Sequence, residues 1–99
     1  MTTVSTIDAT TSLKPRLHVF PNPADDYVQL YVKNLTDIDQ VQIVMYDLLG
    51  REVFTSAVSL SEGSIVERLD ISSVPRGLYV YSVYDEADGL IHTDRLMVK

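Results

Sequence analysis

The chain has 99 residues, 45% of them hydrophobic and 22% charged, which suits one folded domain with a modest core. Its 8 Lys and Arg against 14 Asp and Glu give a formal net charge of -6. The basic residues are scattered singly, with no stripe to neutralise phosphates, so the sequence argues against a nucleic-acid partner. The absence of cysteine rules out disulfides, thiol catalysis and cysteine-based metal centres.

The first stretch of the chain differs from the rest. Residues 1–15 are rich in Ser and Thr and end at Pro15, a composition typical of a linker. We expect a linker over residues 1–16 and a folded domain over residues 17–99. A first strand built from part of residues 1–15 is the structural alternative. The N-terminus lacks the basic and apolar regions of a signal peptide, so we expect an internal protein or a piece of a longer precursor.

From Leu17 onward, short runs of alternating apolar and polar residues are separated by turn signals. No segment shows a sustained period of 3.6, and such spacing is typical of antiparallel sandwiches. The sequence therefore predicts an all-β, Ig-like antiparallel β-sandwich of about seven strands. The predicted strands are 17–20, 27–33, 41–48, 52–60, 65–69, 78–84 and 90–98.

The turns between these runs have recognisable chemistry. Pro21-Asn22-Pro23 cannot continue a helix or occupy the middle of a sheet, so it predicts a stiff corner after the first strand. Residues 47–51 predict a tight reversal in which Gly50 takes a positive φ. Longer turns are expected at 72–77 and 85–89.

Candidate catalytic groups are scarce. His18 and His92 lie in separate predicted strands, and nothing in their spacing predicts a metal site. The sequence has no nucleophile motif and no glycine-rich phosphate loop. We therefore expect no enzymatic activity and no cofactor. The acidic residues 85–89 could supply oxygen ligands to calcium together with Asp37 and Asp39, but a solvated hairpin turn explains them as well and is favoured.

Tyrosines concentrate in the predicted strands. An exposed patch formed by Tyr27, Tyr31, Tyr79 and Tyr81 could bind carbohydrate or protein by stacking, as in an Ig-like or fibronectin-like accessory module. Cross-strand packing in a half-buried sheet explains the same residues, and we favour packing.

Four sequence elements, taken in order, resemble one family: the C-terminal sorting domains of type IX secretion cargo, also called Por secretion tails, of Bacteroidota-type bacteria. The elements are VFPNPADD at 19–26, YDLLGREV at 46–53, DISSVPRGLY at 70–79 and the final stretch 89–99. The resemblance covers nearly the whole chain from Leu17. Arg95 stands where the family usually has lysine, and its planar guanidinium is not equivalent to an ammonium group.

The resemblance implies a secretion address. Its expected partners are the cargo joined to the N-terminal side, the type IX outer-membrane translocon, and the shuttle and sortase-like components that serve it. The domain would pass through the periplasm, the tail would be cut from its cargo within the preceding linker at the cell surface, and the cargo would stay on the surface or be secreted. The residues implied in translocon recognition are Pro75, Gly77, Tyr79, Gly89, Arg95, Leu96, Met97, Val98 and Lys99. The implied structural motif residues are Pro21, Asn22, Pro23, Asp47, Gly50 and Arg51.

The closing strand suggests a mechanism, because a strand at a sheet edge offers unpaired N–H and C=O groups to a receptor strand. On this hypothesis, deletion of residues 95–99 abolishes export and leaves the rest of the domain largely folded. The apolar run Leu96, Met97 and Val98 also makes self-association through the edge an expectation.

Overall fold

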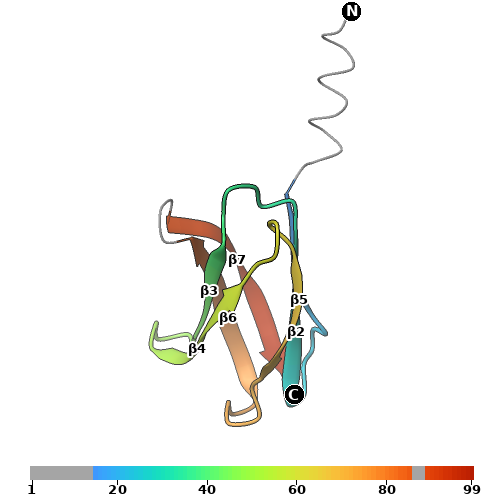
Figure 1. Ribbon diagram of the computed structural model, residues 1–99. Coiled ribbons are helices and arrows are strands. Elements are labelled where there is room, and N and C mark those ends of the chain that lie inside the picture. Colours follow the sequence, from blue (N-terminus) through green and yellow to red (C-terminus); the bar gives the residue numbers. More distant parts are fainter. Residues whose placement is uncertain (1–14, 86–88) are drawn as a thin grey trace, which may run out of the picture.

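The computed structural model describes residues 15–85 and 89–99, and these residues contain seven strands and no helix. Nothing in this part of the chain is a helix long and apolar enough to cross a membrane. Figure 1 shows how the strands are arranged, coloured along the chain. Their bounds are β1 (Arg16–Phe20), β2 (Tyr27–Lys33), β3 (Gln40–Tyr46), β4 (Glu52–Ser59), β5 (Ile65–Asp70), β6 (Gly77–Asp85) and β7 (Gly89–Val98).

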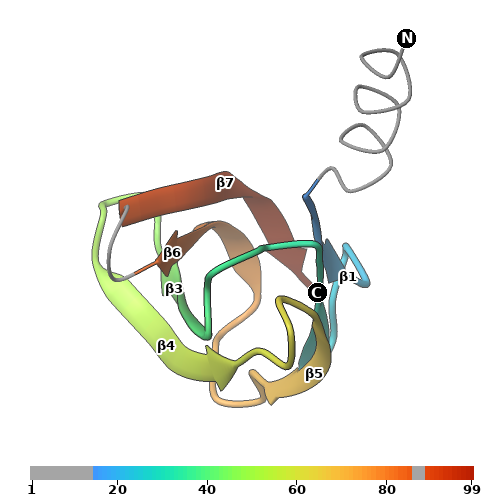
Figure 2. The same ribbon diagram turned by 45° about the horizontal axis from the view of Figure 1, so that its top comes forward.

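The strands form two antiparallel sheets, one with the order β1-β2-β5 and the other with the order β4-β3-β6-β7. The turned view separates the two layers (Figure 2). The predicted all-β sandwich of about seven strands is therefore confirmed. Within this topology β1 and β5 are the edges of one sheet, and β4 and β7 are the edges of the other.

Alternation along the strands fills the core between the sheets. Val28, Leu30 and Val32 of β2 are buried, while the tyrosines and the glutamine between them lie on the outer face, as predicted. Burial of a side chain such as Leu30 stabilises the fold by about 1.5–3 kcal/mol. Val44 of β3 is buried as well, although it lies on the outer face, where it is flanked by its partners Thr55 and Ser82.

Two turns depend on glycine. Gly50 has φ 84°, as predicted for the reversal after β3. That strand ends at Tyr46 instead of Leu48, because Asp47 already belongs to the turn. Gly63, with φ 78°, accepts a hydrogen bond from the N–H of Leu35 at 3.1 Å. A Cβ at this position would lie 2.4 Å from the Leu35 carbonyl oxygen, so the turn excludes any side chain.

The two ends of the described domain lie far apart. Pro15 enters β1 at one end of the sandwich, and Lys99 lies at the other end, beside the far end of β2 (Figure 1). The corner 21–24 after β1 and the connection from β5 to β6 also lie at the Lys99 end. We call this the C-terminal end of the sandwich, and the end near Pro15 the linker end.

Candidate functional site

The last strand is held by the corner that follows the first strand. Ala24 donates its N–H to the Met97 carbonyl oxygen at 2.7 Å, and Lys99 donates its N–H to the Ala24 carbonyl oxygen at 2.8 Å. Ala24 and Val98 thereby form a parallel bridge on the side of β7 away from β6. Because the corner continues from β1, these hydrogen bonds join the edge of one sheet to the edge of the other.

Asn22 extends this contact with its side chain. Its Nδ2 donates to the Arg95 carbonyl oxygen at 3.1 Å, and its Oδ1 accepts from the Met97 N–H at 3.1 Å. The amide thus presents one donor and one acceptor, as a peptide group of a neighbouring strand would. The Arg95 N–H is taken by the carboxylate of Asp94 at 2.8 Å. Both peptide bonds that precede the prolines, Phe20-Pro21 and Asn22-Pro23, are cis.

These bonds correct the edge-pairing hypothesis for the end of the chain. A receptor strand or a second copy was expected to pair with unpaired backbone groups near Leu96, Met97 and Val98. The outward-facing groups from Arg95 to Lys99 are instead already bonded to the corner and to Asp94. Residues 95–99 therefore offer no free edge in the folded domain, and pairing of the closing strand with a receptor strand or a second copy stays a prediction for its earlier residues.

The side chains of the same stretch alternate between two environments. Leu96 and Val98 are core residues, with exposed fractions of 1% and 4%. Met97 is 41% exposed, and Arg95 and Lys99 are also exposed. Of the final residues implied in recognition, only these three can offer side chains to a partner of the folded domain. Leu96 and Val98 act from inside by holding β7 in place.

The Pro75-Gly77-Tyr79 element is a local structural device. The Tyr79 ring is buried, and its hydroxyl donates to the Pro75 carbonyl oxygen four residues earlier. Gly77 lies beside this ring with φ 152°, in the region that favours glycine. Tyr79 thus fixes the path of the chain into β6, while Pro75 remains exposed at the C-terminal end. Gly89, with φ 81°, begins β7 in open space.

The hairpin between β3 and β4 explains the second motif. The Oδ1 atom of Asp47 accepts the N–H groups of Leu49 and Arg51, both at 2.9 Å, and Oδ2 accepts from the Arg51 Nε at 2.8 Å. The backbone N–H of Arg51 is the main cause that holds the pKa of the Asp47 carboxyl below its usual range, and the guanidinium adds to it. Asp47, Gly50 and Arg51 therefore form the tight reversal predicted at residues 47–51.

The tyrosines do not form the exposed patch of the alternative interpretation. Tyr79 and Tyr81 are buried, with exposed fractions of 6% and 4%. Tyr27 is covered by the Arg68 guanidinium, whose Cζ lies 3.8 Å from the ring centroid. Tyr31 stacks on His18 at 5.9 Å between ring centroids. These contacts support the packing interpretation.

His92 is partly buried and lies within hydrogen-bonding distance of a buried tyrosine. Its Nε2 lies 3.1 Å from the Tyr81 hydroxyl. Burial, with the charge of Asp94 adding to it, raises the pKa of Tyr81 to about 12. His18 and His92 lie on β1 and β7, in different sheets.

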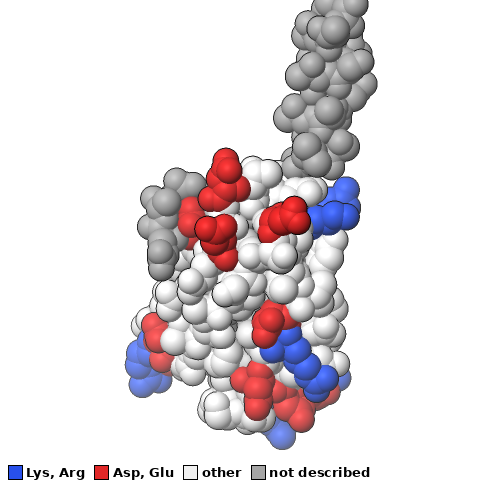
Figure 3. All heavy atoms as spheres, viewed as in Figure 1, with Lys and Arg blue, Asp and Glu red and all other residues white. Residues whose placement is uncertain are grey.

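The acidic turn at residues 85–89 is where the sequence suggests oxygen ligands for calcium. Among the described residues, no group of three or more His, Asp or Glu side chains is arranged to hold a metal ion. Residues 86–88 of the acidic turn lie outside the described residues, so the calcium hypothesis is not tested there. On the face seen in Figure 3, Asp and Glu side chains lie near both ends of the sandwich, and Lys and Arg side chains lie among them at the C-terminal end.

The sandwich and its joined edges define a small β-domain in which the corner and the end of the chain form one unit. A family described as the secretion system C-terminal sorting domain matches residues 18–99, which is most of the chain. This chain belongs to that family. It is accordingly a C-terminal sorting signal of type IX secretion, which directs export to the cell surface or the medium.

The search of curated proteins found no match to the chain. The comparison with solved structures agrees with the fold. Among solved structures, the crystal structure of dimeric latent PorU from Porphyromonas gingivalis matches with a TM-score of 0.70 at 22% sequence identity. The match covers 85% of this chain but only 9% of that chain. At this identity the likeness shows a shared fold and nothing about activity.

Proposed function

We propose that the secretion machinery reads the folded domain at its C-terminal end, on the surface formed by the corner 21–24, the end of β7 and the turn before β6. The observation that carries this proposal is the set of hydrogen bonds between Asn22, Ala24 and the residues from Arg95 to Lys99. These bonds bring two family motifs, 73 or more positions apart in the chain, into one surface.

The third motif element lies at the same end. A hollow there is lined by Asp25, Asp26, Ser72, Val74, Arg76, Val98 and Lys99. It contains both acidic and basic side chains, and the exposed Met97 and Arg95 lie on the adjacent strand. A surface of mixed charge beside an apolar side chain suits a specific protein partner, since complementary charges fix its orientation.

The position of this surface suits a tag that travels with a cargo. The cargo, with its own activity, would be joined on the N-terminal side, next to Pro15, which lies at the opposite end of the sandwich (Figure 1). The machinery could then grip the C-terminal end in the periplasm without meeting the cargo. In this proposal the domain serves as an address and takes no part in catalysis.

We further propose that a sortase-like peptidase at the cell surface cuts the tail from its cargo within the linker ahead of β1, in residues 1–15, one residue shorter than expected from the sequence because Arg16 already belongs to β1. A peptidase needs an extended, unpaired chain in its active site. From Arg16 onward the chain is paired with β2, beginning with Arg16 opposite Lys33. The cut therefore has to fall before the sheet begins.

Export of a reporter tests the recognition surface. A fluorescent protein with a periplasmic signal peptide would carry residues 1–99 at its C-terminus, in hosts with and without a working type IX system. A triple variant, Arg95→Ser, Met97→Ser and Lys99→Ser, changes exposed side chains at the C-terminal end and keeps the backbone bonds to the corner. Its control, Lys33→Ser and Val66→Ser, removes one exposed cation from β2 and one exposed apolar side chain from β5, away from the C-terminal end.

We expect the parent and the control to reach the surface or the medium in the competent host only. The triple variant at the C-terminal end should remain in the periplasm while its unfolding transition stays cooperative. Normal export of that variant would contradict the proposed surface. Equal loss of export in the triple variant and in the control would show that the machinery does not prefer the C-terminal end.

A further inference from the structure

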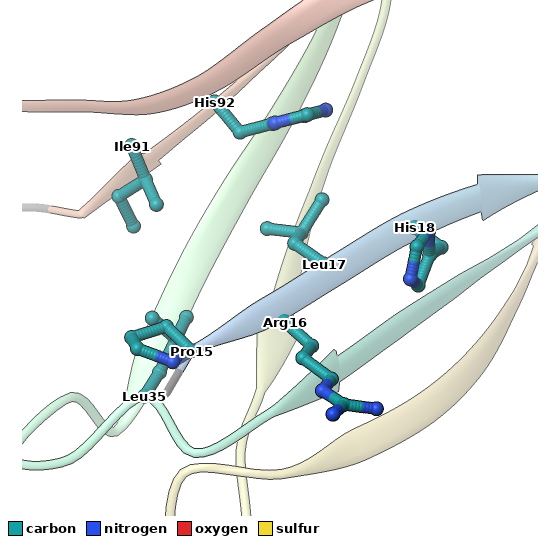
Figure 4. Close-up of a pocket in the computed structure, with 7 residues that line it drawn as sticks. All are labelled: Pro15, Arg16, Leu17, His18, Leu35, Ile91 and His92. Atoms are coloured by element: carbon teal, nitrogen blue, oxygen red, sulfur yellow. The ribbon is translucent and has the colours of Figure 1, made fainter. Parts of the chain in front are cut away.

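The opening between the two sheets on the β1 and β7 side forms a groove at the linker end. Its volume is about 470 Å³. Figure 4 shows Leu17 pointing from β1 toward β7, with Ile91 and His92 on the opposite strand and Leu35 beside Pro15. The residues that line it are Pro15, Arg16, Leu17, His18, Leu35, Ile91 and His92.

Both strands that bound the groove are sheet edges. Within residues 15–85 and 89–99, β1 pairs only with β2, and β7 pairs only with β6 apart from its bridge to Ala24. Along β7 the backbone groups of Arg95, Met97 and Lys99 point outward to the corner and to Asp94. In an antiparallel pair, the N–H and C=O of one residue point toward the neighbouring strand, and those of the next residue point away from it. Thr93 is two residues before Arg95, so its N–H and C=O also point away from β6. Among the described residues, no backbone hydrogen bond joins the outer edge of β7 between Leu90 and Asp94 to another segment.

The groove has an apolar floor that continues the core. Leu35 is a buried core residue, and Leu17 and Ile91 are partly buried and pack against the core. The hydrogen bond to the Tyr81 hydroxyl holds His92 at the margin. Arg16 also lines the groove, but its side chain points away from Leu17 and His92 (Figure 4). A segment lying here would therefore bury alternate apolar side chains against this floor.

We propose that this groove takes one extended polypeptide segment of a partner protein, which adds to the outer edge of β7 at Thr93 as a further strand. The fold already uses the same edge in this way, because Asn22 and Ala24 pair with its other half. The new segment would lie in line with the corner along one continuous edge. A second copy of the domain fits less well, since its edge strand would bring a whole sheet into a space walled by β1.

The identity of the partner as a component of the secretion machinery rests on the proposed function. The proposed strand addition does not rest on that function, because it depends only on the groove and on the outer edge of β7 between Leu90 and Asp94. Main-chain hydrogen bonds would supply affinity, and the pockets over Leu17 and Ile91 would supply selectivity. The groove lies at the linker end, so the segment would engage the domain at a place separate from the C-terminal end.

Substitutions at Thr93 test the inference with a matched pair. Thr93→Pro removes the outward N–H and is compatible with an edge strand. It also removes the hydroxyl, which donates to the Tyr81 carbonyl oxygen and accepts from Ser82, both at 3.1 Å. Thr93→Val removes the same hydroxyl and keeps the N–H, so the two variants differ in the donor that the inference requires.

The probe is a capped hexapeptide in which valine alternates with serine, titrated into isotope-labelled chain 1–99 and followed by NMR. We expect shifts at residues 90–94 and around Leu17, slower hydrogen exchange of the Thr93 amide, and the same response in Thr93→Val. Thr93→Pro should bind about tenfold more weakly, as for one lost hydrogen bond. No binding, or shifts confined to β4 or β5, would overturn the inference. Protection of Thr93 that rises with protein concentration before peptide is added would overturn it in favour of a second copy.

The reporter assay then tests the partner. Reduced export of Thr93→Pro, beside normal export of Thr93→Val, would support a secretion component as the source of the segment. Normal export of a Thr93→Pro variant that no longer binds the peptide would overturn that assignment. The sorting function and the recognition surface at the C-terminal end would stand in that case, because they are tested by other variants.

Discussion

Asn22 and Met97 lie 75 positions apart in the chain, yet the Oδ1 of Asn22 accepts the Met97 N–H at 3.1 Å. With the bond from Nδ2 to the Arg95 carbonyl oxygen, one side chain occupies two positions of a strand edge. The Pro-Asn-Pro corner is thus a partner of the last strand, and the first and last motifs of the family are one structural feature.

Two substitutions of Asn22 should weaken its hydrogen bonds to β7 and lower the stability of the domain. Asn22→Ala removes both bonds and should lower the free energy of unfolding by about 1–3 kcal/mol. Asn22→Asp keeps the acceptor for Met97 and brings a carboxylate against the Arg95 carbonyl oxygen, so its loss should be at least as large as that of one bond. Urea unfolding followed by circular dichroism measures both. Two variants as stable as the parent would show that the corner does not hold β7.

Adjacent residues of β7 should respond very differently to truncation. Leu96→Ala leaves a cavity in the core and should cost about 2–5 kcal/mol. Met97→Ala changes an exposed side chain and should alter the free energy of unfolding by about 0.5 kcal/mol or less. The same urea titration compares the two variants, and similar losses would contradict the side-chain alternation along β7.

Deletion of residues 95–99 should unfold the domain. It removes the buried side chains of Leu96 and Val98, together with the backbone groups that bond to Ala24 and Asn22. Domains of this size have only about 5–15 kcal/mol of stability. We expect the truncated chain to lack a cooperative thermal transition. A sharp transition near that of the full chain would contradict this expectation and restore the value of the deletion as a test of recognition.

Two glycines at positive φ should differ in their tolerance of alanine. At Gly50 nothing lies within 4 Å of an added Cβ, so Gly50→Ala should cost only the backbone strain, about 1–2 kcal/mol. At Gly63 the Cβ would lie 2.4 Å from the Leu35 carbonyl oxygen, which adds a backbone clash to the same strain. We therefore expect a loss of about 3 kcal/mol or more for Gly63→Ala. Thermal unfolding of the two variants shows which one loses more stability. A larger loss for Gly50→Ala than for Gly63→Ala would contradict the packing of the Gly63 turn.

Alkaline pH should destabilise the domain through Tyr81. The unfolded chain loses the tyrosine proton near pH 10, whereas the folded domain keeps it until about pH 12. Between these values the unfolded state binds fewer protons, so the free energy of unfolding falls as the pH rises. Below pH 10 the contribution is fully present.

The comparison is with Tyr81→Phe, measured by urea unfolding from pH 8 to pH 11. The variant should show a shallower fall, although the raised pKa of Tyr46 leaves part of the slope in place. The loss of the bond to His92 lowers the stability of the variant at every pH, so the slope is the informative quantity. Equal slopes would contradict the assignment to Tyr81.

The sequence predicted the local structure well, because each signal acts over a few residues. The alternating runs located all seven strands, and Gly50 and Asp47 identified the β3–β4 turn. The hydroxyl bond from Tyr79 to Pro75 also spans only four positions, but the sequence did not predict it. The inward direction of Leu96 and Val98 was available from the same alternation, which sets them apart from Met97, and it was missed because the run was taken as a continuous apolar edge.

The joint between the corner and β7 could not be predicted in the same way. Asparagine between two prolines is compatible with many turns. Its bonding to Arg95 and Met97 depends on how the edges of two sheets meet, which is a property of the whole fold. The groove at the linker end has the same origin, since β1 and β7 come together only after both sheets have formed.

The placement of the two ends also has a mechanical consequence. A pull on the linker at Pro15 against a hold on Lys99 acts along the length of the sandwich, parallel to the strands. Under such a load, the bonds between Ala24, Met97 and Lys99 are sheared together rather than peeled apart one by one. A domain tethered in this manner resists force better than its modest size suggests, so a translocon could draw its cargo by the tail without unravelling the part that it holds.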